Sequence, residues 1–189
     1  MFSRILVKLV DEAIVPAIVL FSVRILAAIL IAKAYDISFS FGLRGFTYNS
    51  QEDFLFVNSY STLAMISVLA VGLFYVLIKS YLFHDTHVAP HTAAKLFSLN
   101  LSGFIQTSFD VYSQGVIWLS YSYLLVIASG IMFYFGLVYP WVFYSSLALT
   151  FIATLLLILD VEKEIFERKR DAGSQEEVTL KFESMEEEL

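Results

Sequence analysis

The sequence predicts an all-α integral membrane protein with four transmembrane helices, and three observations support this. Of the 189 residues, 58% are hydrophobic and 16% are charged, which is far more apolar than a soluble domain. The apolar residues gather into four stretches, each near the length of about 20 residues that a helix needs to cross a bilayer. The basic residues between the stretches lie mainly in segments that four spans would place on one side of the membrane.

The N-terminal segment predicts a short helix lying in the membrane interface. In residues 2–10, apolar side chains occupy one helical face and Arg4 and Lys8 another. The apolar run that follows is too long for a signal peptide and lacks a small-residue cleavage site, so we expect an uncleaved anchor. The first span is predicted at about 13–34, with Pro16 in its opening turn.

The other three spans are predicted at about 54–79, 114–135 and 139–159. Between the first two spans, aromatic residues alternate with polar ones on either side of Gly42 and Gly45, which predicts a small β-hairpin. The connection between the last two spans is too short for a domain. These two spans are therefore expected to form an antiparallel helix pair.

An amphipathic segment precedes the third span. Over residues 97–110 apolar side chains fall on one helical face and polar ones on the other. A fifth span here would have to bury Lys95 and Asp110, and a Lys or Asp at the bilayer centre costs about 2.5–3.5 kcal/mol. We therefore expect an interfacial helix or a cytoplasmic extension of the third span.

The distribution of positive charge predicts the orientation. Four spans put the N-terminal arm, the second loop and the tail on one side, with the basic residues Arg4, Lys8, Lys79, Lys95, Lys163, Arg168, Lys169 and Arg170. The opposite side holds Lys33 and Arg44, while Arg24 lies within a span and Lys181 lies far from the bilayer. Because basic residues accumulate in cytoplasmic loops, we expect a multi-pass protein of the cell membrane with both termini in the cytoplasm.

The chain divides into a transmembrane domain at residues 1–160 and a cytoplasmic segment at 161–189. The cytoplasmic segment begins as a charged helix, in which Lys163 and Glu167 lie four residues apart, and ends in an acidic tail that we expect to be disordered. The net charge of −6 comes largely from this tail. Nucleic acid is therefore not an expected partner.

Arg24 is the most informative single residue, because a guanidinium inside a transmembrane helix is costly unless it faces other helices, water or an opposite charge. The other spans offer it no carboxylate at mid-depth, but they contain Asn58 and many hydroxyl groups. Arg24 is therefore expected to bind such groups, an anionic ligand or another chain. A packing or interface role, a ligand or ion path, and a side chain that reaches the membrane surface all fit the sequence.

Ser146, Thr150 and Thr154 recur every four residues along the fourth span. This small-residue pattern favours close helix packing with hydrogen bonds across the interface. A polar pore lining would show the same pattern.

All three histidines lie between the second and third spans, where His84, His87 and His91 accompany Asp85. Such a group is a candidate site for a transition metal. Pro90 interrupts any helix that would bring the three together, and the spacing does not match H-E-x-x-H. A pH-sensitive contact at the membrane surface and an ordinary interfacial turn are the alternatives.

The sequence favours a protein without catalytic activity. It contains no P-loop, G-x-S-x-G or H-E-x-x-H motif, and no cysteine that could act as a nucleophile. We expect a non-enzymatic subunit or scaffold of a membrane complex or homo-oligomer, whose partners are the lipid bilayer and other membrane protein subunits. The alternatives are an oligomeric channel or transporter for a small solute or ion with Arg24 in its pathway, and a metal-dependent membrane enzyme using His84, His87 and His91.

Overall fold

The computed structural model describes residues 10–42, 45–83, 90–100 and 108–187. Within these ranges the chain is mostly helical, and four helices are long and apolar enough to cross a membrane, as the sequence predicts. They are α2 (Val15–Ala34), α3 (Gln51–Phe83), α5 (Ser108–Tyr134) and α6 (Pro140–Glu187). The shorter elements are the π-helical turn η1 (Val10–Ile14), strands β1 (Phe39–Gly42) and β2 (Gly45–Tyr48), and α4 (Pro90–Ser98).

Two expected elements fall largely outside the described residues. The interfacial helix at residues 2–10 is one of them, since the description begins at Val10. The amphipathic segment at residues 97–110 is the other, because it is described only at its two ends, in α4 with the residues just after it and in the first turn of α5. Both remain predictions.

The β-hairpin predicted between the first two spans is confirmed. β1 and β2 pair antiparallel, with Phe39 opposite Tyr48 and Phe41 opposite Phe46. The rings of Phe41 and Phe46 lie 5.1 Å apart between centroids. Gly45 opens β2 with a φ of 92°, a conformation that residues with a side chain rarely adopt. The hairpin therefore presents a cluster of aromatic rings next to the helices.

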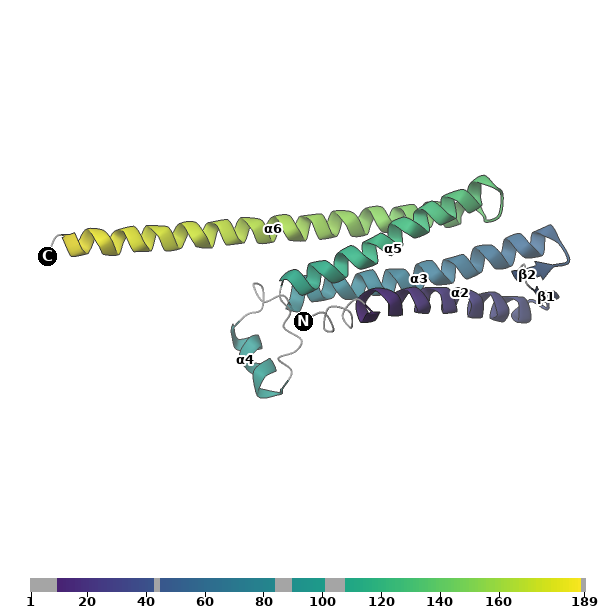
Figure 1. Cartoon of the computed structure of the whole chain (residues 1–189), viewed down its shortest axis with the longest axis horizontal. Coiled ribbons are helices and arrows are strands. Elements are labelled where there is room, and N and C mark those ends of the chain that lie inside the picture. Colours follow the sequence, from purple (N-terminus) through teal and green to yellow (C-terminus); the bar gives the residue numbers. More distant parts are fainter. Residues whose placement is uncertain (1–9, 43–44, 84–89, 101–107, 188–189) are drawn as a thin grey trace.

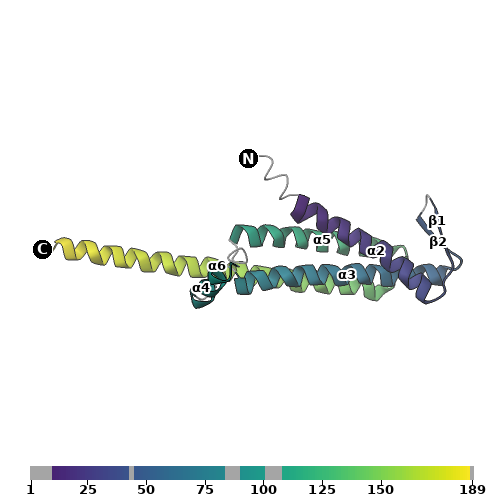
Figure 2. The same ribbon diagram turned by 90° about the horizontal axis from the view of Figure 1, so that it is seen from below.

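α3 is the central helix of the bundle. It packs against α2, α5 and α6, whereas α2 packs mainly against α3 (Figures 1 and 2). Leu69 and Leu73 of α3 are each 1% exposed and lie in a core to which Leu20 of α2, Leu125 of α5 and Val142 of α6 also belong. Because α2 and α5 each pack against α3, there is room for a groove between α2 and α5.

The α5–α6 connection closes an antiparallel helix pair, as the sequence predicts (Figure 1). The Leu137 N–H donates to the Met132 carbonyl at 2.8 Å, and the Gly136 N–H donates to the Phe133 carbonyl at 3.0 Å. With Gly136 at a φ of 65°, this is a Schellman motif, in which glycine ends the helix and reverses the chain. We call the end of the bundle that holds this connection and the β-hairpin the hairpin end (Figure 1).

α6 is one continuous helix of 48 residues, or about 70 Å at 1.5 Å per residue. The sequence leads us to expect a disordered acidic tail, but the helix continues through that tail to Glu187 (Figures 1 and 2). Nucleation is the costly step of helix formation, and residues after Asp160 extend a helix that already exists. We call residues 161–187 the arm.

Candidate functional site around Arg24

Arg24 lies midway along α2, and its side chain is partly buried between helices. Its Nη2 atom donates to Oδ1 of Asn58 in α3 at 2.8 Å and lies 3.5 Å from the sulfur of Met132 in α5. Both contacts use Nη2, so Nε and Nη1 have no hydrogen-bond partner among the described residues. Nor does any carboxylate in the described ranges form an ion pair with this guanidinium.

Asn58 connects Arg24 to the α5–α6 connection. While its Oδ1 accepts from Arg24, its Nδ2 donates to the carbonyl of Leu137 at 2.6 Å. A second bond at this level runs from the Tyr139 N–H to Oγ of Ser59 at 2.9 Å. The amide orientation of Asn58 is thereby fixed from both sides, and the position of the guanidinium is fixed with it.

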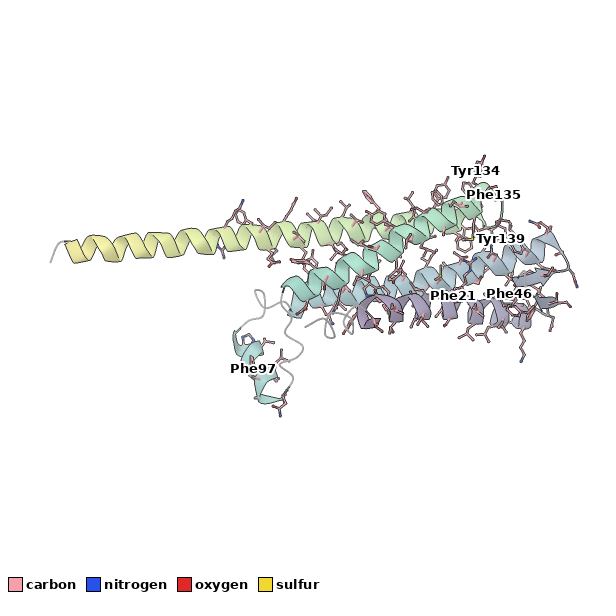
Figure 3. The ribbon with its side chains drawn as sticks, viewed as in Figure 1. Phe21, Phe46, Phe97, Tyr134, Phe135 and Tyr139 are labelled. Atoms are coloured by element: carbon pink, nitrogen blue, oxygen red, sulfur yellow. The ribbon has the colours of Figure 1, made fainter. Side chains whose placement is uncertain are left out.

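A cavity of about 580 Å³, which we call the chamber, lies between Arg24 and the β-hairpin. Its lining includes Phe41, Phe46 and Tyr48 of the hairpin together with Asn58, Ser61 and Met132 of the helices. Phe21 of α2 and Phe46 of β2, both labelled in Figure 3, border it. Burial raises the pKa of the Tyr48 phenol, which is therefore neutral at physiological pH. Arg24 is the charged residue of this lining.

A second cavity of about 350 Å³, which we call the groove, lies between α2 and α5. Arg24 and Phe21 border both cavities. The groove is otherwise lined by Ala17 and Leu20 of α2, Met65 of α3, and Tyr121, Leu124, Leu125 and Ala128 of α5. Apart from Phe21 and Arg24, which border both cavities, the groove residues of each helix lie farther from the hairpin end than its chamber residues do. The guanidinium therefore stands where a partly polar chamber meets an apolar groove.

The polar residues of α6 face α5 within the same chain. The hydroxyl oxygens of Ser146 and Ser129 are 2.8 Å apart, and those of Thr150 and Ser122 are 2.5 Å apart. Thr154 lies 3.0 Å from the hydroxyl of Tyr123. Ser146 and Thr150 are buried. The two buried hydroxyls thus lie in the α5–α6 interface.

The histidines are only partly covered by the described residues. His84 and His87 lie outside them, and His91 is exposed near the start of α4. Among the residues that the structure does describe, no group of three His, Cys, Asp or Glu side chains could hold a metal ion. The transition-metal site and the enzyme built on it therefore stay predictions.

Two buried carboxylates were missed by the sequence analysis. Asp160 and Glu164 of α6 are 1% and 3% exposed, although they begin the charged stretch after the fourth span. The hydroxyl of Ser80 in α3 donates to Asp160, and that of Tyr112 in α5 donates to Glu164. The available signal was their spacing of four residues, which puts both on one helical face.

Comparisons of the chain with models of protein families, with curated proteins and with solved structures found no match. Two features of the chain's own residues point to function: the Arg24 site and the arm.

Proposed function

We propose that the chain is a four-span protein of the cell membrane, with both termini in the cytoplasm, that acts as a non-enzymatic subunit or scaffold of a membrane assembly. The arm carries this proposal. The apolar part of α6 that is long enough to cross a bilayer ends at Phe166, which leaves the last 21 residues of the helix, 167–187, for a role in the aqueous phase. In Figures 1 and 2 the arm projects beyond the ends of α3 and α5.

The end of the arm has the charge of a docking segment for a basic surface. Residues 171–187 of the arm contain the acidic residues Asp171, Glu176, Glu177, Glu183, Glu186 and Glu187, and Lys181 as the basic residue. Charge complementarity speeds association and selects partners. We therefore propose a cytoplasmic partner protein with a basic surface.

The test compares the full chain with a version truncated after Arg170, each purified in mild detergent and weighed by native mass spectrometry. We expect the full chain to carry a second protein in fixed stoichiometry and the truncated chain to lose it. A full chain that is alone, or a partner that the truncated chain retains, would contradict the proposal.

A variant of unchanged length separates charge from helix length. Replacing Glu176 and Glu177 with glutamine should weaken partner binding and reduce its dependence on salt, because exposed ion pairs are screened. The matched control replaces their neighbours Ser174 and Gln175 with alanine and should bind as the full chain does. Equal binding by both variants would argue against an electrostatic docking segment.

An oligomeric channel or transporter is the second candidate, because the chamber places a cavity of about 580 Å³ at Arg24. Leu69, Leu73 and Val142 fill the space between α3, α5 and α6, so a pathway would run between copies of the chain. The mass measurement above discriminates the two candidates. A discrete homo-oligomer, with flux in liposomes that Arg24→Ala changes, would favour transport.

A further inference from the structure

We propose that the Arg24 site binds one anionic phospholipid from the bilayer, with the phosphate at the guanidinium and an acyl chain in the groove. The inference goes beyond the proposed subunit role. It rests on the proposed function for the location in a membrane. The proposed orientation decides only which leaflet supplies the lipid, and that is the extracytoplasmic leaflet.

The charge of the site calls for an anion. A guanidinium in a membrane-embedded helix is stable when an opposite charge or hydrogen-bond acceptors face it. Asn58 supplies one acceptor through Nη2, which leaves Nε and Nη1 without a partner in the described part of the chain. The planar fork of arginine matches two oxygens of a phosphate. A phosphate in the chamber would therefore complete the hydrogen bonding of Arg24.

The two cavities follow one another as the two parts of a phospholipid do, with polar groups in the chamber and apolar side chains in the groove. Asn58, Ser61 and the phenol of Tyr48 give the chamber polar groups beside the charge. Apart from Arg24 at its end, the groove is lined by aliphatic side chains, by Met65 and by the rings of Phe21 and Tyr121. The hydroxyl of Tyr121 donates to the Ala13 carbonyl at 2.6 Å. That bond uses the polar end of Tyr121, so the groove offers an apolar surface to an acyl chain.

Although Arg24 lies midway along α2, its guanidinium reaches Asn58, whose position along α3 agrees with the depth of a phosphate group. The apolar part of α3, Gln51–Tyr81, has 31 residues and spans about 46 Å, close to the 40–45 Å of a whole bilayer. Asn58 lies seven residues after Gln51, or about 10 Å from that end. With a hydrocarbon core of about 30 Å, this is near the boundary between headgroups and acyl chains.

The direction and the opening of the groove also fit a lipid. From Arg24 the groove runs away from the hairpin end toward Ala17, which is the direction of an acyl chain that starts at the headgroup boundary. Leu124 of its wall is 59% exposed, and Ala128 is also exposed. The groove is therefore open sideways, and a lipid can enter it from the bilayer between α2 and α5.

The experiment uses the purified full chain in mild detergent with equal amounts of phosphatidylglycerol and phosphatidylcholine of identical acyl chains, and native mass spectrometry counts the bound lipid. We expect one phosphatidylglycerol per chain and weaker binding of phosphatidylcholine. Arg24→Gln should lower phosphatidylglycerol affinity about 10-fold or more, the effect expected for losing hydrogen bonds to a charged group. The matched control Lys33→Gln removes an exposed cation of the same helix that lies outside both cavities, and should change nothing.

A second variant tests the groove without altering the charge. Ala128→Trp fills the groove and should lower phosphatidylglycerol binding, whereas Ala148→Trp places the same ring on an exposed position of α6 outside both cavities. Inorganic phosphate, which has no acyl chain, should not displace the lipid. If Arg24→Gln does not fold, Arg24→Lys replaces it, because lysine retains the positive charge but lacks the planar guanidinium fork. Together with Ala128→Trp, this variant completes the test.

The outcomes are distinguishable from those of the subunit proposal. Equal binding of the two lipids, unchanged binding in Arg24→Gln, unchanged binding in Ala128→Trp, or displacement by inorganic phosphate would each overturn the lipid site. The chain truncated after Arg170 keeps both cavities and should bind phosphatidylglycerol as the full chain does, whether or not the arm binds a partner.

Discussion

The ring of Trp118 in α5 lies directly against the backbone of Gly72 in α3. A Cβ atom added to Gly72 would lie 2.2 Å from Cζ3 of that ring. Trp118 also packs against the buried core that contains Leu69 and Leu73. Because 2.2 Å is far below van der Waals contact, any side chain at residue 72 would force the ring or the helix to move. The absence of a side chain at Gly72 therefore sets how closely α3 and α5 approach.

We predict that Gly72→Ala destabilises the bundle by about 1–3 kcal/mol, the usual cost of overpacking a core. Alanine favours a helix over glycine by about 1 kcal/mol, so a loss of stability would have to come from the contact with Trp118. The control is Gly115→Ala, whose Cβ would lie 3.6 Å from Leu157, at ordinary contact distance. It should be neutral or stabilising. Unfolding by denaturing detergent, followed by circular dichroism, measures both, and equal stability of the two variants would refute the prediction.

The hydroxyl pair Ser122–Thr150 should contribute measurably to the pairing of α5 and α6. In a double-mutant cycle of Ser122→Ala and Thr150→Val we expect a coupling energy of about 0.6 kcal/mol, a typical value for side-chain hydrogen bonds between membrane helices. The control is Ser120→Ala, because Ser120 is exposed and donates to the Val116 carbonyl of its own helix. Coupling between Ser120 and Thr150 should be absent, and equal coupling in both cycles would show that the effect is not local.

The structure shows which features the sequence could predict. The length of each apolar stretch fixed the number of long helices, and alternating aromatic residues around Gly42 and Gly45 were enough to predict the hairpin. These are local signals. The contact of Arg24 with Asn58 depends instead on how α2 is rotated against α3, which a nearly uniform apolar surface does not specify. The place of Asp160 at the start of a charged stretch predicts exposure, and only its spacing of four residues from Glu164 indicates that the two share a helical face that could be buried.

Asn58 offers a way to give Arg24 a counter-charge from within the chain. Asn58→Asp places a carboxylate where Oδ1 now accepts from Nη2 at 2.8 Å, so it should pair with the guanidinium and compete with a bound phosphate. We predict several-fold weaker phosphatidylglycerol binding by native mass spectrometry, with the fold retained. Asn58→Leu should instead cost about 1–3 kcal/mol, because the Leu137 carbonyl and Arg24 lose their partner. Tighter lipid binding in Asn58→Asp would speak against the phosphate assignment.

Ser80 is predicted to stabilise the far end of the bundle through Asp160. The carboxylate is buried, and its other oxygen, Oδ1, has no hydrogen-bond partner in the part of the chain that is described. Ser80→Ala should therefore cost about 1–3 kcal/mol, and almost nothing in an Asp160→Ala background. Ser67→Ala serves as the control, since Ser67 is exposed and donates to the Leu63 carbonyl of its own helix. An equal loss in both backgrounds would show that Ser80 acts by packing alone.

The proposed orientation can be tested with single cysteines, because the chain contains no cysteine that would give background labelling. Ser40 of β1 and Ser98 of α4 are both exposed, and α3 lies between them in the sequence. If α3 crosses the membrane with the hairpin end outside, a membrane-impermeant maleimide should label Ser40→Cys in intact cells. It should label Ser98→Cys only after the cells are permeabilised, and labelling after denaturation controls for expression. Labelling of both in intact cells would mean that α3 does not cross, whereas the reverse pattern would mean that the orientation is inverted and that the Arg24 site faces the cytoplasmic leaflet.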